Sequence, residues 1–292
     1  MNQITLKAYA KLNLTLDIID RRADGYHNLR MLMQSVDLFD TVTITRGGEG
    51  IRVILSDAEI PSDERNTAYR AAMAFYRLAE IQPEGLTIEI EKRIPSQAGM
   101  AGGSADAAAV LEGMNTLYKT QISNHQLIEL GAEIGADVPF CIVGGTKLVE
   151  GIGDLITDLP EIDPCYFVIA KGETGVNTGA AFRRFDECGS SSRPDTDSVL
   201  AALVAGDLEA AGQGFANALY DAADLPEIGE LIEKIKEFDP LGAVMTGSGS
   251  AVFGMFTDLH DAKRCEKALR KEVPFVCLAK PVDCGLEEIE SL

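Results

Sequence analysis

A glycine-rich loop between a strand pattern and a helix pattern is the feature that most constrains how this chain folds. From Leu86 to Ile90 apolar residues alternate with polar ones, which is typical of a strand with one buried face. The glycine-rich segment 95–106 follows, and after Ser104 apolar residues recur at helical spacing as far as Tyr118. The sequence therefore predicts a strand, a glycine loop and a helix, in that order.

The loop has the composition of an anion-binding site. Gly99, Gly102 and Gly103 come directly before the start of the helix, where unpaired N–H groups and the helix dipole attract negative charge. Phosphate is the natural ligand for such a loop. No Gly-Lys-Ser/Thr sequence follows, so the loop is not a Walker A motif. A glycine-rich tight turn with no ligand is the alternative.

The rest of the first half mixes strands with helices. Residues 4–18 alternate with period two and predict two strands or one bent strand, with Lys11 and Asn13 on the polar face. Residues 42–55 predict two further strands, broken at the glycine pair 47–48. Residues 66–80 predict a helix that Asn66 caps. Ser123 and Gln126 form a capping box for another helix.

The second half is predicted to be a separate, more helical domain. The boundary falls in a linker between Pro160 and Pro164, which gives domains of residues 1–160 and 161–292. The polar run 188–197 predicts a surface loop, and residues 208–220 and 228–238 predict amphipathic helices. Residues 242–279 predict strand, strand, helix and strand, an ending of ferredoxin-like appearance. The fold class is therefore α+β.

The charge of the chain narrows its partners. The formal net charge of -20 repels polyanions, which argues against nucleic acid and anionic membranes as general partners. An anionic small-molecule substrate would need a locally positive cleft. Hydrophobic residues make up 46% of the chain and charged residues 25%, as expected for a packed globular protein.

Cysteine and histidine usage argues against a structural metal site. The six cysteines contain no CxxC pair, and the three histidines lie far apart, so we expect no zinc site. Scattered thiols are typical of a reducing compartment. There is no basic N-terminal segment followed by an apolar stretch and no apolar run of about 18 residues. We therefore expect a cytoplasmic protein.

Three motifs in order resemble those of the GHMP kinases, the family of galacto-, homoserine, mevalonate and phosphomevalonate kinases. They are Lys11-Leu-Asn-Leu, the glycine loop, and the turn Met245-Thr-Gly-Ser-Gly-Ser-Ala-Val-Phe253. Ala105 and Thr246 depart from the usual pattern, where serine is common. The resemblance implies a ribosomal-protein-S5-domain-2-like α/β sandwich followed by a ferredoxin-like domain, with ATP and Mg²⁺ as cofactors.

Within the family, two further segments resemble the motifs of one branch: Asp24-Gly-Tyr26-His27 and Gly135-Ala-Asp137-Val-Pro139. Its substrate is a cytidine diphosphate-linked methylerythritol, phosphorylated on its 2-hydroxyl in isoprenoid precursor synthesis. The resemblance makes Asp137 the catalytic base and Lys11 its partner. Judged without the resemblance, the residues favour an N-cap before Val138-Pro139 for Asp137 and a solvated lysine on an exposed strand face for Lys11.

The resemblance also implies binding residues. Those for ATP are Pro95, Ser96, Gln97, Ala98, Gly99, Met100, Ala101, Gly102, Gly103, Ser104 and Ala105, with Asn66 and Lys92 toward the adenine. Those for the substrate are Asn13, Tyr26, His27, Thr178, Phe182, Gly247, Ser248 and Gly249. Among them Tyr26 and Phe182 would stack on cytosine, and His27 would read its edge. The alternatives are helix capping for Asn66, surface solvation for Lys92 and core packing for Phe182.

Two other functions stay open at this point. Another GHMP kinase, of homoserine or mevalonate type, would share the glycine loop but would not need Tyr26, His27 and Phe182. A non-catalytic sensor of sugars or nucleotides would keep the fold without turnover, although intact Lys11 and Asp137 speak against it. We expect a monomer or a weak homodimer that acts on a small molecule.

Overall fold

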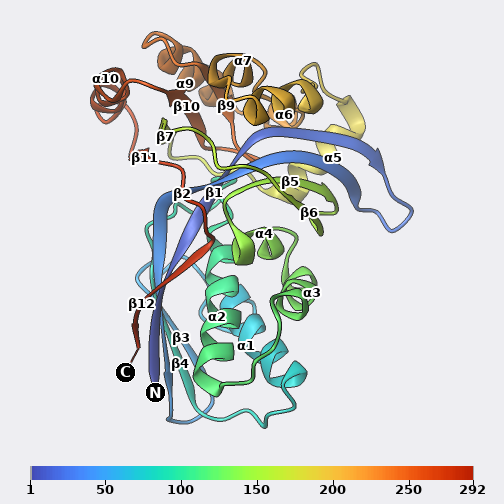
Figure 1. The fold of residues 1–292 in the computed structure, drawn as a ribbon, viewed down its shortest axis with the longest axis vertical. Helices are drawn as coiled ribbons and strands as arrows, with labels where there is room; N and C mark the ends of the chain where they lie inside the picture. Colours follow the sequence, from blue (N-terminus) through green and yellow to red (C-terminus); the bar gives the residue numbers. More distant parts are fainter. Residues whose placement is uncertain (1, 292) are drawn as a thin grey trace.

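Two long strands form an antiparallel hairpin that runs through both halves of the molecule (Figure 1). The computed structural model describes residues 2–291. β1 is Gln3–Arg21 and β2 is His27–Arg46. The alternating segment 4–18 is thus one strand, and irregularities in its pairing with β2 after Tyr9, Asn13 and Ile18 allow it to bend.

The first half is a sheet with helices packed on one side (Figure 1). The strands run in the order β12-β1-β2-β4-β3, and β5 pairs with β2 and with β6. These strands are β3 (Ile51–Leu55), β4 (Leu86–Glu91), β5 (Thr146–Gly151), β6 (Leu155–Asp158) and β12 (Leu286–Ser291). The helices are α1 (Thr67–Leu78), α2 (Gly102–Tyr118), α3 (Asn124–Ile134) and α4 (Val138–Val143). α2 contacts β1 and β2 on one side and the other three helices on the other, while α1 and α4 also contact strands of the sheet.

Local signals determine where these helices begin. The Asn66 side chain accepts a hydrogen bond from the Ala68 amide at the start of α1, which confirms the predicted cap. Ser123 and Gln126 form the predicted capping box of α3. α2 begins at Gly102 without a side-chain cap, directly after Ala101 in the left-handed conformation. The first backbone amides of α2 therefore receive no acceptor from a capping side chain.

The second half contains a four-stranded antiparallel sheet in the order β11-β7-β10-β9. Its elements are β7 (Tyr166–Lys171), α5 (Thr178–Cys188), α6 (Thr196–Val204), α7 (Leu208–Gln213), β8 (Ala216–Asn217), α8 (Tyr220–Ala223), α9 (Pro226–Lys236), β9 (Gly242–Met245), β10 (Val252–Phe256), α10 (Leu259–Leu269) and β11 (Phe275–Ala279). Numbered along the chain, the strands lie in the order 4-1-3-2, which agrees with the ferredoxin-like ending predicted from the sequence.

The predicted helix 208–220 is correct at its start and wrong after Gln213. α7 ends at Gln213, and β8 follows as a parallel partner of β1. The Asn217 amide donates to the carbonyls of Met245 and Gly247, so tertiary hydrogen bonds hold this segment extended against its helical pattern. The predicted surface loop 188–197 is shorter than expected, because α6 begins at Thr196 and Asp195 caps it.

The C-terminal strand corrects the predicted domain division. β12 pairs antiparallel with β1, so residues 286–291 belong to the first sheet and not to a unit of residues 161–292. The domain boundary predicted near residue 160 stays a proposal for the remainder of the chain. Within residues 2–291, no helix is both long enough and apolar enough to cross a membrane.

Candidate active site

A cavity of about 410 Å³ lies where the glycine loop, the hairpin and the second half meet. Many residues predicted for the site line it: Lys11, Asn13, Asn66, Lys92, Pro95, Ser96, Gln97, Ala98, Gly99, Met100, Ala101, Gly102, Gly103, Ser104, Asp137, Thr178, Phe182, Gly247 and Ser248. Tyr26, His27, Ala105 and Gly249 are predicted for the site but do not line this cavity. The structure thus brings together groups from six separate parts of the sequence.

The glycine loop is tied to the second half by its backbone. The Gln97 carbonyl accepts from the amides of Val176 and Ser250, and the Ala98 carbonyl accepts from Ala251. Gln97 and Ala101 both have positive φ, a costly conformation for residues other than glycine. The surrounding contacts therefore hold the loop in one shape.

Gly99 and Gly247 face each other across this junction. Gly99 has φ +73°, and a Cβ there would lie 2.1 Å from the Thr246 carbonyl oxygen. Gly247 has φ +57°, and a Cβ there would lie 2.6 Å from the Gly99 carbonyl oxygen. The absence of side chains at these two positions is required by the packing of the first half against the second, in addition to any ligand.

The first two backbone amides of α2 donate no hydrogen bond within the described chain. Those of Gly102 and Gly103 donate to no acceptor within residues 2–291, whereas those of Ser104 and Ala105 donate to Ala101. Thr67 fixes the turn by donating to the Gly103 carbonyl at 2.6 Å. Two free N–H groups at the positive end of a 17-residue helix are donors of the kind that bind anions at helix N-termini.

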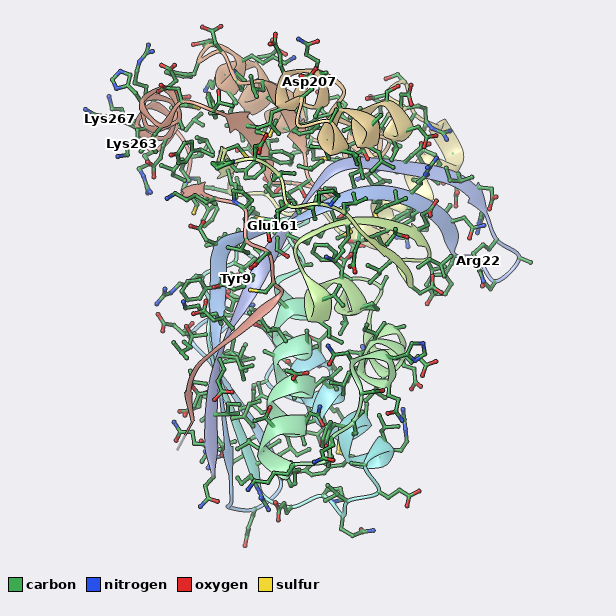
Figure 2. All side chains as sticks on the ribbon, in the orientation of Figure 1. Tyr9, Arg22, Glu161, Asp207, Lys263 and Lys267 are labelled. Atoms are coloured by element: carbon green, nitrogen blue, oxygen red, sulfur yellow. The ribbon has the colours of Figure 1, made fainter. Side chains whose placement is uncertain are left out.

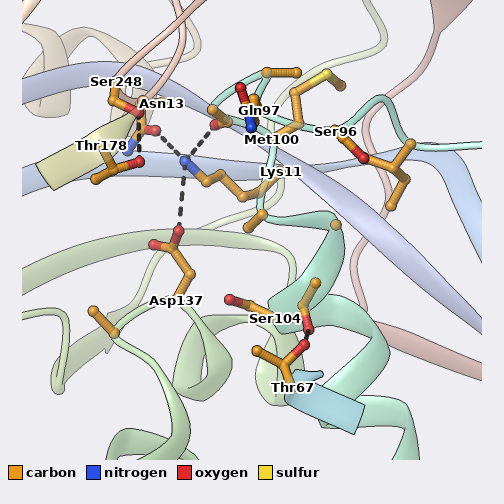
Figure 3. A pocket seen from close by; sticks show the side chains of 18 of the residues that line it. Lys11, Asn13, Thr67, Ser96, Gln97, Met100, Ser104, Asp137, Thr178 and Ser248 are labelled. Carbon is orange, nitrogen blue, oxygen red and sulfur yellow. Dashed lines mark hydrogen bonds and ion pairs between the residues drawn. The ribbon is translucent and has the colours of Figure 1, made fainter. Parts of the chain in front are cut away.

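Lys11 is buried in the middle of the site (Figure 3). Its side chain is only 3% exposed, which excludes the solvated surface lysine considered from the sequence. Nζ donates to Asn13 Oδ1 at 2.5 Å and to the Gly99 carbonyl at 2.7 Å. Thr246 Oγ1 in turn accepts from the Asn13 amide at 2.9 Å. The ammonium group is therefore fixed by residues of the first half, and Thr246 from the second half holds Asn13 in place.

Asp137 faces this ammonium from the other side of the cavity (Figure 3). Its Oδ2 lies 4.0 Å from Lys11 Nζ, and its side chain is 36% exposed. Asp137 occupies the N-cap position of α4, but its side chain makes no capping hydrogen bond. The capping explanation of this aspartate is therefore not supported, and the carboxylate is free to accept a proton from a bound molecule.

Thr178 and Ser248 extend the site toward α5. Their hydroxyl groups lie 2.8 Å apart and join the start of α5 to the turn between β9 and β10. Asn177 caps α5 by accepting from the Ala180 amide, which fixes the direction of the helix. The hydroxyl pair lines the cavity on the side that Phe182 also lines.

Lys92, predicted to lie toward the adenine, lines the cavity but is also paired within the protein. Its Nζ donates to Asp106 Oδ2 at 2.7 Å and also to Asp40 Oδ2, beneath the glycine loop. Burial lowers the pKa of Lys92, but the two carboxylates outweigh burial and raise it above its usual value. Asn66 is similarly engaged, since its amide nitrogen donates to the Pro61 carbonyl while its oxygen caps α1.

The second carboxylate in this cluster is incompletely satisfied. Asp106 Oδ1 is sealed from solvent and has no hydrogen-bond partner within the described chain. Burial raises the pKa of Asp106 to about 7, although the charge of Lys92 opposes this shift. At pH 7 and above, the folded protein therefore holds a second buried negative charge beside a single ammonium group.

Stability should fall as the pH rises through 7, and Asp106→Asn should remove this loss. The folded pKa lies above the unfolded value of about 3.9, so the contribution of this group is fully present below pH 4 and is lost toward pH 7. Relative to the wild type, the variant should gain on the order of a few kcal/mol between pH 5 and 8. Urea unfolding at both pH values measures the difference, and parallel pH profiles would contradict it.

The three residues predicted to hold a base lie in different surroundings. Tyr26 is 63% exposed and follows the turn at the tip of the hairpin, where Figure 2 shows Arg22. His27 is buried and stacks on Phe182, with ring centroids 5.0 Å apart and planes 25° apart. Only Phe182 lines the cavity. The structure thus stacks His27 on Phe182, whereas the ring of Tyr26 pairs with no other aromatic ring within the described residues.

Several site residues were missed from the sequence. Asp40 and Asp106 bind Lys92, and Asp186 binds His27 Nε2 at 2.7 Å. Asp186 lies four residues after Phe182, one helical turn away, so helical spacing could have indicated it. Apolar residues also line the cavity: Leu16, Leu29, Met31, Ile60, Ile94, Ile152 and Leu219.

Models of one protein family match two segments of the chain. The GHMP kinases N terminal domain matches residues 66–145, and the GHMP kinases C terminal domain matches residues 199–274. The chain belongs to the GHMP kinase family and is an ATP-dependent phosphotransferase with an alcohol as acceptor. The predicted α+β fold, with an S5-domain-2-like first half and a ferredoxin-like second half, is confirmed.

Relatives in sequence share one name. The chain is 40% identical over 281 residues to the 4-diphosphocytidyl-2-C-methyl-D-erythritol kinase of Clostridium acetobutylicum, covering 96% of this chain and 100% of the relative. It is 43% identical over 268 residues to the enzyme of that name from Caldicellulosiruptor saccharolyticus, covering 91% and 92% respectively. The likeness therefore extends over nearly the whole chain.

Solved structures agree on the fold and differ in name. A crystal structure of 4-(cytidine 5'-diphospho)-2C-methyl-D-erythritol kinase has a TM-score of 0.79 at 31% identity, covering 95% of this chain and 99% of that one. Homoserine kinase from Cytophaga hutchinsonii also has a TM-score of 0.79, at 20% identity, covering 99% and 98%. The fold alone does not distinguish these two enzymes.

Proposed function

We propose that this protein transfers the γ-phosphate of ATP to the 2-hydroxyl of 4-diphosphocytidyl-2-C-methyl-D-erythritol, a step of the methylerythritol phosphate route to isoprenoids. The observation that carries the proposal is the pairing of Lys11 with Asp137 in the same cavity as the glycine loop and Phe182. The names and identities of the full-length relatives support this substrate over others in the family.

In this proposal Asp137 accepts the proton of the attacking hydroxyl. Its carboxylate is partly exposed, and no capping hydrogen bond occupies it. An alcohol attacks phosphorus more readily when a base within hydrogen-bond reach takes its proton. Lys11, held by Asn13 and the Gly99 carbonyl, places a fixed positive charge where negative charge develops on the reacting oxygens.

The glycine loop binds the phosphates of ATP in this proposal. The free amides of Gly102 and Gly103 point from the N-terminus of α2, and Ser104 adds a hydroxyl in its first turn. The transferred phosphoryl group is metaphosphate-like, so catalysis depends mainly on position and charge. The constrained loop supplies the position, because its carbonyls are bonded to the second half.

Mg²⁺ is the proposed metal cofactor. Residues 2–291 contain no group of three His, Cys, Asp or Glu side chains that could hold a metal ion by themselves. Magnesium commonly binds through substrate phosphates with one or two protein ligands, so this donor set is compatible with it. Ser104 is the cavity hydroxyl beside the loop that would supply one oxygen. When bound, the metal would neutralise charge on the phosphates.

Phe182 is the proposed platform for the cytosine base, and Phe182→Ala tests it. Stacking contributes roughly 1–3 kcal/mol per base, so the substrate Kd should rise by about 5- to 150-fold while ATP affinity changes little. Calorimetric titration with each ligand measures both. Phe238→Ala, an aromatic outside the cavity, is the control and should leave both affinities intact. Equal losses for the two ligands would contradict a role in base binding.

The remaining expectations about partners stay predictions. The net charge of -20 supports a small-molecule substrate over nucleic acid or anionic membrane. A cytoplasmic location and a monomer or weak homodimer complete the proposal.

The deciding experiment is an ATP-dependent phosphorylation assay on three acceptors. We expect turnover of 4-diphosphocytidyl-2-C-methyl-D-erythritol and none of homoserine or mevalonate. Turnover of homoserine or mevalonate alone would assign another substrate within the family. Binding of ATP and substrate without ADP formation would instead support a non-catalytic sensor.

A further inference from the structure

Three side chains of α5 surround the imidazole of His27. Phe182 covers part of one face, with ring centroids 5.0 Å apart, and Phe185 contacts it edge-on, with centroids 6.3 Å apart. Asp186 Oδ1 lies 2.7 Å from Nε2. These residues occupy positions i, i+3 and i+4 of one helix, so they share a face. The ring is therefore held against rotation and tilting.

Asp186 determines which imidazole nitrogen carries the proton. A carboxylate only accepts hydrogen bonds, so Nε2 must donate to it. Arg21 Nη1 lies 3.4 Å from Asp186 Oδ2, so the carboxylate is paired on its other oxygen as well. In a neutral imidazole whose Nε2 is protonated, Nδ1 has a lone pair and is an acceptor.

His27 Nδ1 is available to a ligand. It makes no hydrogen bond to any residue within 2–291, and it is not one of the side-chain nitrogens sealed from solvent. Its neighbour Phe182 lines the cavity. A hydrogen-bond acceptor of fixed orientation thus lies beside the aromatic ring that we propose as the base platform.

The stacking geometry leaves room for a base in the plane of the imidazole. Nearly parallel rings in contact are separated by about 3.5 Å, so a centroid distance of 5.0 Å requires a lateral offset of similar size. Part of the Phe182 ring is therefore left uncovered by His27. A base bonded to the edge of the imidazole would continue that layer over the uncovered part.

We propose that Asp186 is the positioning residue that makes this enzyme select cytosine over uracil. Cytosine carries an amino group at C4, which donates to an acceptor, whereas uracil carries a carbonyl oxygen there. An Nδ1 held as an acceptor bonds the amino group and leaves the uracil oxygen facing a lone pair. A site built to bond one group discriminates against an analogue that leaves it unpaired. This inference rests on the proposed cytidine substrate.

Asp186→Asn tests the inference. The amide has almost the same shape but can present either a donor or an acceptor to Nε2, so it no longer fixes the imidazole protonation. The ratio of kcat/KM for the cytidine substrate over its uridine analogue should fall at least about 10-fold, the equivalent of one hydrogen bond. The change should arise in KM, with kcat and the KM for ATP nearly unchanged.

A spectroscopic readout separates positioning from general damage. The ¹⁵N shifts of His27 should report the Nε2–H form in the wild type and a mixture of both forms in Asp186→Asn. Asp186→Glu retains a carboxylate and should recover part of the discrimination. Asp197→Asn is the matched control, because it breaks an exposed pair with Arg30 at 2.6 Å on another helix. It should leave the cytidine preference intact.

The outcomes distinguish this inference from the proposed function. Cytidine turnover with unchanged discrimination in Asp186→Asn, or a wild-type His27 protonated on Nδ1 alone, would overturn the role of Asp186 and leave the proposed function standing. A wild-type enzyme that ignores the cytidine substrate would overturn both. If Asp186→Asn does not fold, Asp186→Glu and the wild-type ¹⁵N shifts decide the matter.

Discussion

Asp137→Asn should reduce kcat by about 10²–10⁴-fold, the range expected when a general base is removed. Asparagine has the size of aspartate but does not accept the proton of the substrate hydroxyl at neutral pH. The substrate KM and the melting temperature should change little, since the Asp137 side chain makes no capping hydrogen bond. Steady-state kinetics with thermal unfolding of the same preparation measures both effects.

A true capping aspartate provides the control for this prediction. Asp258 caps α10 by accepting from the amides of His260 and Asp261. Asp258→Ala should lower stability by roughly 0.5–2 kcal/mol and leave kcat intact. The two variants should therefore show opposite patterns. An Asp137→Asn enzyme with normal turnover and a lowered melting temperature would restore the structural explanation of that residue.

The elements of the first half were predictable because their signals are local. The strand at Leu86–Glu91, the helix that follows the glycine loop, and the caps at Asn66 and Ser123 all depend on residues within a few positions. The burial of Lys11 was not predictable in this way. A polar residue on the outer face of an alternating strand looks solvated until the Gly99 loop and Thr246 cover it.

The errors in the predicted elements of the second half also arise from contacts between residues that are distant in sequence. Residues 208–220 have the apolar spacing of a helix. The side-chain amide of Asn217, however, donates hydrogen bonds to the carbonyls of Met245 and Gly247, and these bonds hold the neighbouring residues extended. The strand at Leu286–Ser291 is short, and its pairing with β1 spans almost the whole chain. Pairing between residues so distant in sequence cannot be predicted from the local periodicity of the chain.

The sequence identified the glycine loop, but not all that its glycines do. Phosphate approach was the reason inferred for Gly99, yet its positive φ and its contact with Thr246 come from packing between the halves. Lys92 was inferred to face the nucleotide, and two buried carboxylates bind it. Residue type alone does not distinguish a cation that meets a ligand from one that pairs within the protein.

Lys11→Met should reduce kcat by about 10²–10³-fold, as is typical when one group that stabilises developing negative charge is removed. Methionine retains most of the length of the lysine but has neither its charge nor its donors. The variant should also lose about 1–3 kcal/mol of stability, because the Gly99 carbonyl and Asn13 Oδ1 lose their buried partner. Kinetics and urea unfolding of the same protein separate the two losses.

Lys147→Met separates the charge of Lys11 from the general cost of replacing a buried lysine. Lys147 is also buried, but its Nζ pairs with Asp158 at 3.2 Å and it does not line the cavity. That variant should lose stability with kcat unchanged. Because Lys11 and Asp137 act on one proton transfer, the double variant Lys11→Met/Asp137→Asn should be only slightly slower than the slower single variant. Losses in kcat that multiply in the double variant would mean that the two side chains act independently, and the proposed pairing at the substrate hydroxyl would then be wrong.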